Sequence, residues 1–158
     1  MPEGQAKTVR VALIDDQLLV RHALSALLEE RGLASVVASH THGDRALDGL
    51  GAKGADAVII GFDAQVHDPI ETVSKLRRDF PELPICALLG TGEPARVQGA
   101  LSAGCSGVLS AGASLEMMVS AIDYLIEGQA YVDPNLGGPL LMAGLWRGNH
   151  RQRPKQKE

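Results

Sequence analysis

The chain has 158 residues, of which 45% are hydrophobic and 22% are charged. This length predicts one domain with a sizeable core, and the composition excludes a wholly disordered chain. No apolar run approaches the roughly 20 residues of a membrane span, and residues 1–10 lack the apolar core of a signal peptide, so we expect no membrane association and a cytoplasmic location. A net charge of −4 and only two Phe, two Tyr and one Trp argue against a nucleic-acid groove in the body.

The first half of the chain alternates between short apolar runs and segments in which apolar residues recur at helical spacing. Val9–Ile14 is predicted to be a strand, and the helix after it ends at Gly32. Residues 35–39 predict a weaker second strand, and residues 44–53 a second helix. The continuous apolar run 57–62 predicts a third strand that is covered on both faces. The apolar residues that give the first helix its period are Val20, Leu24, Leu27 and Leu28.

The second half continues the same alternation. Residues 70–80 predict a third helix, and residues 85–89 predict another buried strand. Residues 94–104 predict a fourth helix, because proline suits its first turn and glycine its end. Residues 107–109 predict a fifth strand, and Ser114 is a good N-cap for a last helix. The predicted core face of that helix comprises Leu115, Met118, Val119, Ile122 and Ile126.

Five strands that alternate with helices predict an α/β fold, namely a doubly wound, five-stranded parallel sheet in a three-layer sandwich. In such sheets, ligands bind at the carboxyl ends of the strands, near a topological switch point. The first strand brings Asp15 and Asp16 to that edge, and the third strand brings residues 61–63 there. Any chemistry is therefore expected at this edge.

Three stretches of the chain carry a family pattern: VRVALIDDQLLVRHALSALLEE, FPELPICALL and AGCSGVLSAGASLEMMVSAI. They resemble the receiver domain of two-component response regulators of the NarL/FixJ type, over residues 9–133. The resemblance implies a flavodoxin-like domain that accepts a phosphoryl group from a histidine kinase on an aspartate at the end of the third strand. It also implies that the acidic pair binds Mg²⁺, and that a Thr or Ser after the fourth strand and a Lys after the fifth contact the phosphoryl oxygens.

The chain keeps the acidic pair of this family and departs from the pattern elsewhere. Gly61 stands where the resemblance puts the phosphoacceptor aspartate, and glycine has no nucleophile. Leu89 or Gly90 stands at the Thr/Ser position, and Ala111 stands at the Lys position. The predicted degenerate phosphorylation site therefore comprises Gly61, Leu89 and Ala111. We expect no catalytic residue, no enzymatic activity and no histidine kinase partner.

The remaining carboxylates leave alternatives open. Asp15 and Asp16 bind a divalent cation weakly, or Asp16 caps the first helix while Asp15 is merely solvated, and the second interpretation is favoured. Without the lysine, two facing carboxylates repel each other, so one of them is expected to have a raised pKa. Asp63, two residues after Gly61, is the candidate substitute phosphoacceptor, which in-line geometry disfavours. No cofactor is expected beyond weakly bound Mg²⁺.

The last predicted helix also carries a second apolar stripe, which comprises Met117, Ala121 and Tyr124. A homodimer is predicted to form through this stripe. The receiver is predicted to cover residues 8–133, and residues 134–158 a linker helix with a basic tail. In the family such a linker leads to a helix-turn-helix effector domain, which is absent from this chain. DNA binding is therefore expected to run through that missing domain.

These observations predict an atypical, phosphorylation-independent receiver domain that acts in transcription regulation through dimerisation. Two alternatives remain open. One is a ligand-sensing pseudo-receiver that binds a small molecule in the vacated acidic pocket, and the other is a conventional receiver that uses Asp63 as its acceptor. Cys86 and Cys105 are predicted to be buried thiols, since their number and spacing suit neither a disulfide framework nor a metal site.

Overall fold

The computed structural model describes residues 8–41, 54–63, 68–90 and 93–136. Six parallel strands form one sheet in the order β2-β1-β3-β4-β5-β6. The strands are β1 (Val9–Ile14), β2 (Ala34–His40), β3 (Ala57–Gly61), β4 (Ile85–Leu89), β5 (Gly107–Ser110) and β6 (Tyr131–Val132). The helices are α1 (Leu18–Glu30), α3 (Pro69–Asp79), α4 (Pro94–Ala103) and α5 (Leu115–Ile126). The helix predicted over 44–53 and the basic tail lie outside the described residues.

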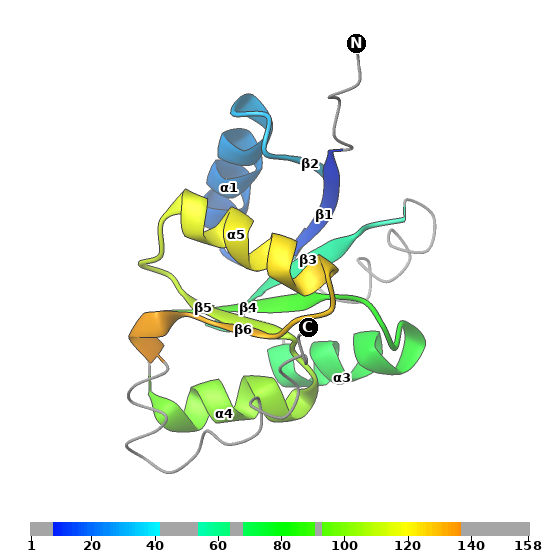
Figure 1. Ribbon diagram of the computed structural model, residues 1–158, viewed down its shortest axis with the longest axis vertical. Coiled ribbons are helices and arrows are strands. Elements are labelled where there is room, and N and C mark those ends of the chain that lie inside the picture. Colours follow the sequence, from blue (N-terminus) through cyan, green and yellow to red (C-terminus); the bar gives the residue numbers. More distant parts are fainter. Residues whose placement is uncertain (1–7, 42–53, 64–67, 91–92, 137–158) are drawn as a thin grey trace, which may run out of the picture.

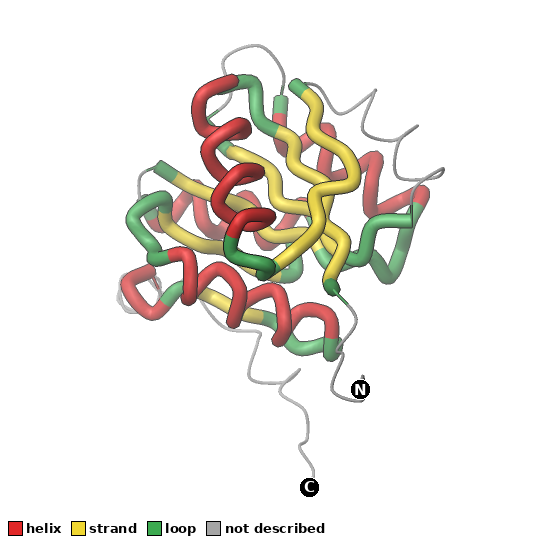
Figure 2. The backbone as a smooth tube through the Cα atoms, turned by 90° about the horizontal axis from the view of Figure 1, so that it is seen from above, coloured by secondary structure: helices red, strands yellow, loops and turns green. Residues whose placement is uncertain are grey.

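Helices cover both faces of the sheet (Figures 1 and 2). Successive residues of a strand point to opposite faces, so each strand contributes to two apolar clusters. In β3, Ile59 packs in the cluster that holds α1 and α5, whereas Val58 and Ile60 pack in the cluster that holds α3 and α4. The predicted three-layer α/β sandwich is confirmed. Among the described residues, no helix has the length and apolar character needed to cross a bilayer.

The sheet has six strands rather than the predicted five. Five strands lie within one residue of their predicted bounds, but β6 was not expected. It consists of Tyr131–Val132 and pairs in parallel with β5, where the Tyr131 N–H donates to the Ser106 carbonyl at 3.2 Å. Two residues are too few to show a hydrophobic period, so the sequence carried no signal for this strand.

The chain directly after β6 is fastened into the domain by Asp133. Its side chain is fully buried and accepts hydrogen bonds from the backbone N–H of Ser110 at 2.9 Å and of Asn135 at 2.9 Å. Its own N–H donates to the Val108 carbonyl at 2.9 Å. Leu136 is also buried and joins the cluster that contains α3 and α4. The end of β5 and the start of the following segment are therefore linked through one carboxylate.

Arg77 of α3 ties together two turns at the amino end of the sheet. Its guanidinium donates to the carbonyls of Leu83 at 2.7 Å and Gly104 at 2.7 Å, and to two further carbonyls in the turn that follows α3. Gly104 has a φ of +121°, and a Cβ atom there would lie 3.3 Å from the Arg77 side chain. Glycine is therefore the residue that both the backbone conformation and the close approach favour at this turn.

Both cysteines are buried free thiols, as predicted. Burial raises the pKa of Cys86 to about 12, and it raises the pKa of Cys105 as well. Thiols in such surroundings remain protonated and unreactive.

The predicted faces of two helices need correction. Ile126 is predicted on the core face of α5 but is 41% exposed, and Leu27, which belongs to the apolar period of α1, is 44% exposed. Ala121 was assigned to the exposed stripe of α5 but is fully buried. The physical reason is the spacing i, i+3, i+4 and i+7, which puts one arc of the helix against the sheet. The residues on that arc are Met118, Ala121, Ile122 and Leu125.

The burial of Ala121 predicts a large effect of a charge at this position. Ala121→Asp should lower the free energy of unfolding by about 3 kcal/mol or more, because the new carboxylate has no partner in the core. Ser120→Asp, at the exposed neighbouring position, should stay within roughly 0.5 kcal/mol of the parent chain. Urea denaturation of the two variants measures the difference. Equal stability of the variants would contradict the burial of Ala121.

Candidate functional site

The carboxyl end of β1 carries a buried aspartate. Asp15 is 9% exposed, and its Oδ1 accepts a hydrogen bond from the Gln17 N–H at 2.8 Å. Its backbone N–H donates to the carbonyl of His40, the last residue of β2. Asp15 is therefore a fixed part of the sheet edge. The interpretation of Asp15 as a solvated residue is wrong.

Asp16 does not cap the first helix, which is a second correction. The N-cap of α1 is Gln17, and no side chain accepts a hydrogen bond at this cap. The Gln17 N–H instead donates to Asp15, two residues earlier, in a local turn of the kind that aspartates favour. The buried acid thus satisfies the backbone at the start of the helix, while Asp16 remains half-buried beside it.

The carboxylate of Asp15 lies directly over Gly61, the last residue of β3. A Cβ atom at Gly61 would lie 2.1 Å from Asp15 Oδ2 and 2.7 Å from its Cγ. Both distances are far below van der Waals contact, so any side chain at position 61 would have to displace the Asp15 carboxylate. Glycine at position 61 and the observed Asp15 conformation therefore depend on each other.

A buried arginine supports this arrangement from α1. Arg21 is 8% exposed, and its Nη1 donates to the Asp15 carbonyl at 2.7 Å and to Thr41 Oγ1 at 2.9 Å. Its Nε is buried and has no hydrogen-bond partner among the described residues. Arg21 thus joins the turn after β1 to the turn after β2, with a positive charge close to the acidic pair.

The pKa of Asp15 is raised above its ordinary value, as expected for one member of the pair. Burial is the largest cause, opposed by the hydrogen bond from Gln17. Repulsion by Asp16 raises the pKa further, Arg21 lowers it, and Asp63 raises it. The expected repulsion between carboxylates is therefore present, but loss of solvation outweighs it.

A second carboxylate covers the end of β4. A Cβ atom at Gly90 would lie 2.0 Å from Asp63 Oδ2. The other oxygen of Asp63 pairs with Arg96 of α4, at 3.1 Å from its Nη2. The same Nη2 donates to the Phe62 carbonyl. Asp63 thus reaches across the sheet edge from the end of β3 to α4.

The structure brings together four of the predicted positions, places Leu89 in the core and leaves Ala111 exposed at the end of the next strand, β5. Asp15, Gly61, Asp63 and Gly90 lie at one edge, where neighbouring strands β1, β3 and β4 end. Leu89 is fully buried in the apolar core, so Gly90 rather than Leu89 faces the site. Ala111 is exposed after β5, where its N–H donates to the Leu89 carbonyl at 2.8 Å.

The donor set of this edge suits Mg²⁺ poorly. Mg²⁺ demands near-ideal octahedral geometry and is usually held by carboxylates together with substrate phosphate. Among the described residues, no group of three or more His, Cys, Asp or Glu side chains could hold a metal ion. One oxygen of Asp15 is engaged by Gln17, and Asp63 is paired with Arg96.

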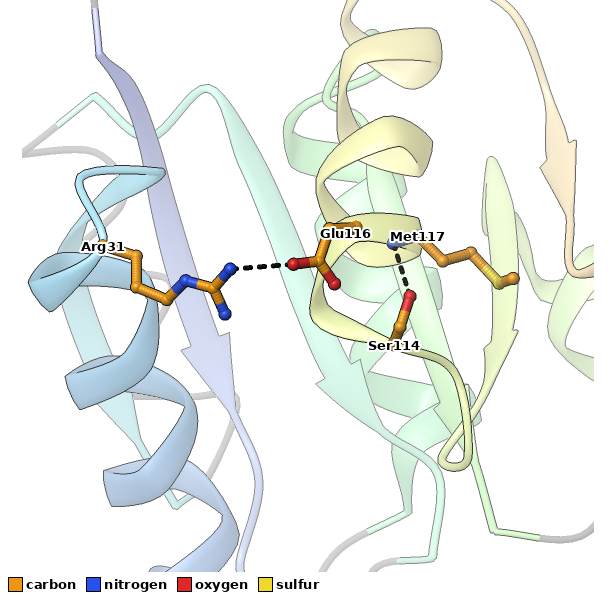
Figure 3. Close-up of polar contacts among 4 residues, drawn as sticks. All are labelled: Arg31, Ser114, Glu116 and Met117. Carbon is orange, nitrogen blue, oxygen red and sulfur yellow. Dashed lines mark hydrogen bonds and ion pairs between the residues drawn. The ribbon is translucent and has the colours of Figure 1, made fainter.

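The two flanks of α5 differ in chemistry (Figure 3). Glu116 points toward α1 and pairs with Arg31 at 2.8 Å, whereas Met117 points away from Arg31. Ser114 caps the helix as predicted, because its Oγ accepts from the Met117 N–H at 3.0 Å. A hydrogen bond from its own backbone and the Arg31 guanidinium hold the pKa of Glu116 below its ordinary value.

Only part of the predicted stripe on α5 is at the surface. Tyr124 is 48% exposed and packs edge-on against Tyr131 of β6, with ring centroids 5.6 Å apart. Met117 is half-buried against the cluster that holds α1 and α5. The stripe is therefore reduced to Met117 and Tyr124.

Sequence reasoning missed both arginines of the site. Arg21 and Arg96 contact groups 6 to 34 residues away along the chain, and they match no local motif. One signal was available for Arg21. Arg21 shares a helix face with Leu24 and Leu28, which lie three and seven residues later. A charged side chain on such an apolar face needs hydrogen-bond partners, because burial removes it from water.

The site and fold have counterparts among known proteins. The response regulator GacA of Pseudomonas viridiflava is 28% identical over 134 residues, which are 85% of this chain and 63% of GacA. The chain therefore spans less than two thirds of the length of this relative. A two-component response regulator of the LuxR family from Aurantimonas sp. SI85-9A1 superposes with a TM-score of 0.80 at 22% identity, over 89% of this chain and all of that one.

A third counterpart is RcsB, in a structure of two RcsB dimers bound to two parallel DNAs. It superposes with a TM-score of 0.74 at 20% identity, over 85% of this chain and 69% of RcsB. These two structural likenesses show the same fold. Residues 11–123 match the response regulator receiver domain family. This match covers most of the chain, and the chain belongs to that family.

Proposed function

We propose that this chain is an atypical receiver domain whose output does not depend on phosphorylation of an aspartate at the end of β3. The observation that carries the proposal is the contact between Asp15 and Gly61. Gly61 is the last residue of β3 and offers no nucleophile, and the carboxylate of Asp15 fills the space that a side chain there would need. The resemblance to receivers puts the phosphoacceptor at this position.

Asp63 is a poor substitute acceptor. Phosphoryl transfer requires a free carboxylate oxygen in line with the donor. One oxygen of Asp63 pairs with Arg96 and the other lies over Gly90, so both oxygens are already engaged in contacts within the chain. These contacts favour the phosphorylation-independent function over a conventional receiver that uses Asp63.

The ligand-sensing alternative receives less support than the residue types suggested. Gly61, Leu89 and Ala111, in place of the polar side chains of the family, predict a roomier and less polar pocket. In the structure the carboxylates of Asp15 and Asp63 lie over the glycines at the ends of β3 and β4. A ligand would have to displace both carboxylates and break the pair between Asp63 and Arg96.

The output proposed for this domain is regulation of transcription through self-association. The counterpart RcsB forms dimers on DNA, and GacA is longer than this chain. DNA contact is proposed to run through an effector domain beyond the receiver. Within the receiver, Met117 and Tyr124 are the proposed dimer contacts on α5, and Met117 lies on the flank that faces away from Arg31.

The first test of this function is chemical. Incubation with acetyl phosphate and Mg²⁺ should leave the intact mass unchanged, because no carboxylate at the end of β3 is free to accept the phosphoryl group. Mass spectrometry of the intact chain provides the measurement. A stable adduct of one phosphoryl group that disappears in Asp63→Asn would instead support the conventional receiver.

Metal binding offers an independent test. The acidic pair should bind Mg²⁺ with a Kd of about 1 mM or weaker, because few free carboxylate oxygens remain and no phosphate completes the shell. Isothermal titration of the parent chain, of Asp15→Asn and of the exposed control Asp79→Asn measures this. Micromolar binding that only Asp15→Asn removes would show that the pair is a working metal site.

The dimer contacts are tested by introducing charge at the two proposed contact residues of α5. Met117→Lys and Tyr124→Lys should each weaken a concentration-dependent dimer by about tenfold or more, because a charge would lie unpaired in an apolar contact. Leu27→Lys, at an exposed position of α1, is the matched control and should leave the dimer unchanged. Sedimentation velocity over a range of concentrations measures the constants. A monomeric parent chain, or loss of the dimer only in Leu27→Lys, would refute this contact surface.

A further inference from the structure

The ion pair formed by Asp63 and Arg96 links the candidate site to α4. Asp63 follows β3, and Arg96 is the third residue of α4. The two residues are 33 positions apart in sequence. The guanidinium also donates to the Phe62 carbonyl, so it holds both the backbone and the side chain at the end of β3.

We propose that this pair is a built-in latch that holds α4 in one position against the end of β3. The anion in this contact is a carboxylate of the chain itself, so the contact forms without an added phosphoryl group. The inference rests on the proposed function and deepens it, because it names the interaction that fixes the signalling edge in the unmodified protein.

Glycine at position 90 is the second requirement of the latch. Asp63 Oδ2 occupies the place of a side chain at this position, because a Cβ atom added to Gly90 would lie only 2.0 Å from that oxygen. Any side chain at position 90 would therefore have to displace the carboxylate that pairs with Arg96. The latch can therefore be opened sterically as well as electrostatically.

The surroundings of Arg96 favour a closed latch. The side chains of Asp63 and Arg96 are 39% and 38% exposed, so solvent screens the pair only in part. The Arg96 Nε is buried without a hydrogen-bond partner among the described residues. Because one N–H is already unsatisfied, loss of the two remaining acceptors, the Phe62 carbonyl and Asp63, would leave more of the guanidinium without hydrogen bonds.

Three variants open the latch by different means. Asp63→Asn removes the negative charge, Arg96→Met removes the guanidinium but keeps the apolar stem, and Gly90→Ala displaces Asp63 without changing any charge. Asp79→Asn, an exposed residue at the end of α3, is the matched control for loss of one carboxylate. All four are full-length chains without phosphodonor.

Amide hydrogen exchange of α4 measures the latch. Each of the three variants should speed exchange in Pro94–Ala103 by roughly threefold to fivefold, while amides of β1 and β3 in the core keep their rates. The double variant with Asp63→Asn and Arg96→Met should exchange no faster than Arg96→Met alone, because Arg96→Met already removes the contact between the two side chains. A merely structural role would instead speed exchange throughout the domain.

Unchanged α4 exchange in the three variants, or equal acceleration of the β1 and β3 amides, would overturn the latch. So would additive effects of Asp63→Asn and Arg96→Met. The test of the proposed function is separate, because it measures the intact mass after treatment with acetyl phosphate. A phosphoryl adduct would refute phosphorylation independence, whereas the exchange rates judge the latch.

Discussion

The arrangement of the candidate site depends on the close approach of side-chain carboxylates to backbone at two glycines. Gly61 and Gly90 follow one another across the sheet, at the ends of neighbouring strands β3 and β4. Because neither has a Cβ atom, Asp15 and Asp63 can each fold down onto the edge of the sheet. Larger residues at these positions would force both carboxylates outward. The positions of the Asp15 and Asp63 carboxylates thus depend on the presence of glycine at positions 61 and 90.

Inward carboxylates require nearby positive charge or donors, and the chain supplies them from helices. Arg21 of α1 binds the backbone of Asp15, and Arg96 of α4 binds Asp63. Arg21 also bonds to Thr41 after β2, and Arg96 also bonds to the Phe62 carbonyl next to Asp63. Arg21 and Arg96 therefore bring positive charge to this edge from the chain itself. They also tie helices from opposite faces of the sheet to the same edge.

Much of the fold could be predicted because a buried parallel sheet leaves a strong pattern. Continuous apolar runs such as 57–62 and 85–89 located strands to within one residue. The identity of Ala121 could not settle its burial, since alanine is common on both sides of a helix. The contacts of Asp63 could not be predicted either. They depend on Arg96 and Gly90, which the sequence shows only as an isolated charge and a loop glycine.

The buried carboxylate of Asp133 has a geometric consequence for whatever follows the receiver. It accepts hydrogen bonds from the backbone N–H of Ser110, at the end of β5, and of Asn135, which follows β6. Leu136 is packed into the core one residue later. The backbone from Asp133 to Leu136 is thus held in one conformation by hydrogen bonds and packing. A displacement of β5 would therefore also move residues 133–136, which are bonded to it through the Asp133 carboxylate and backbone.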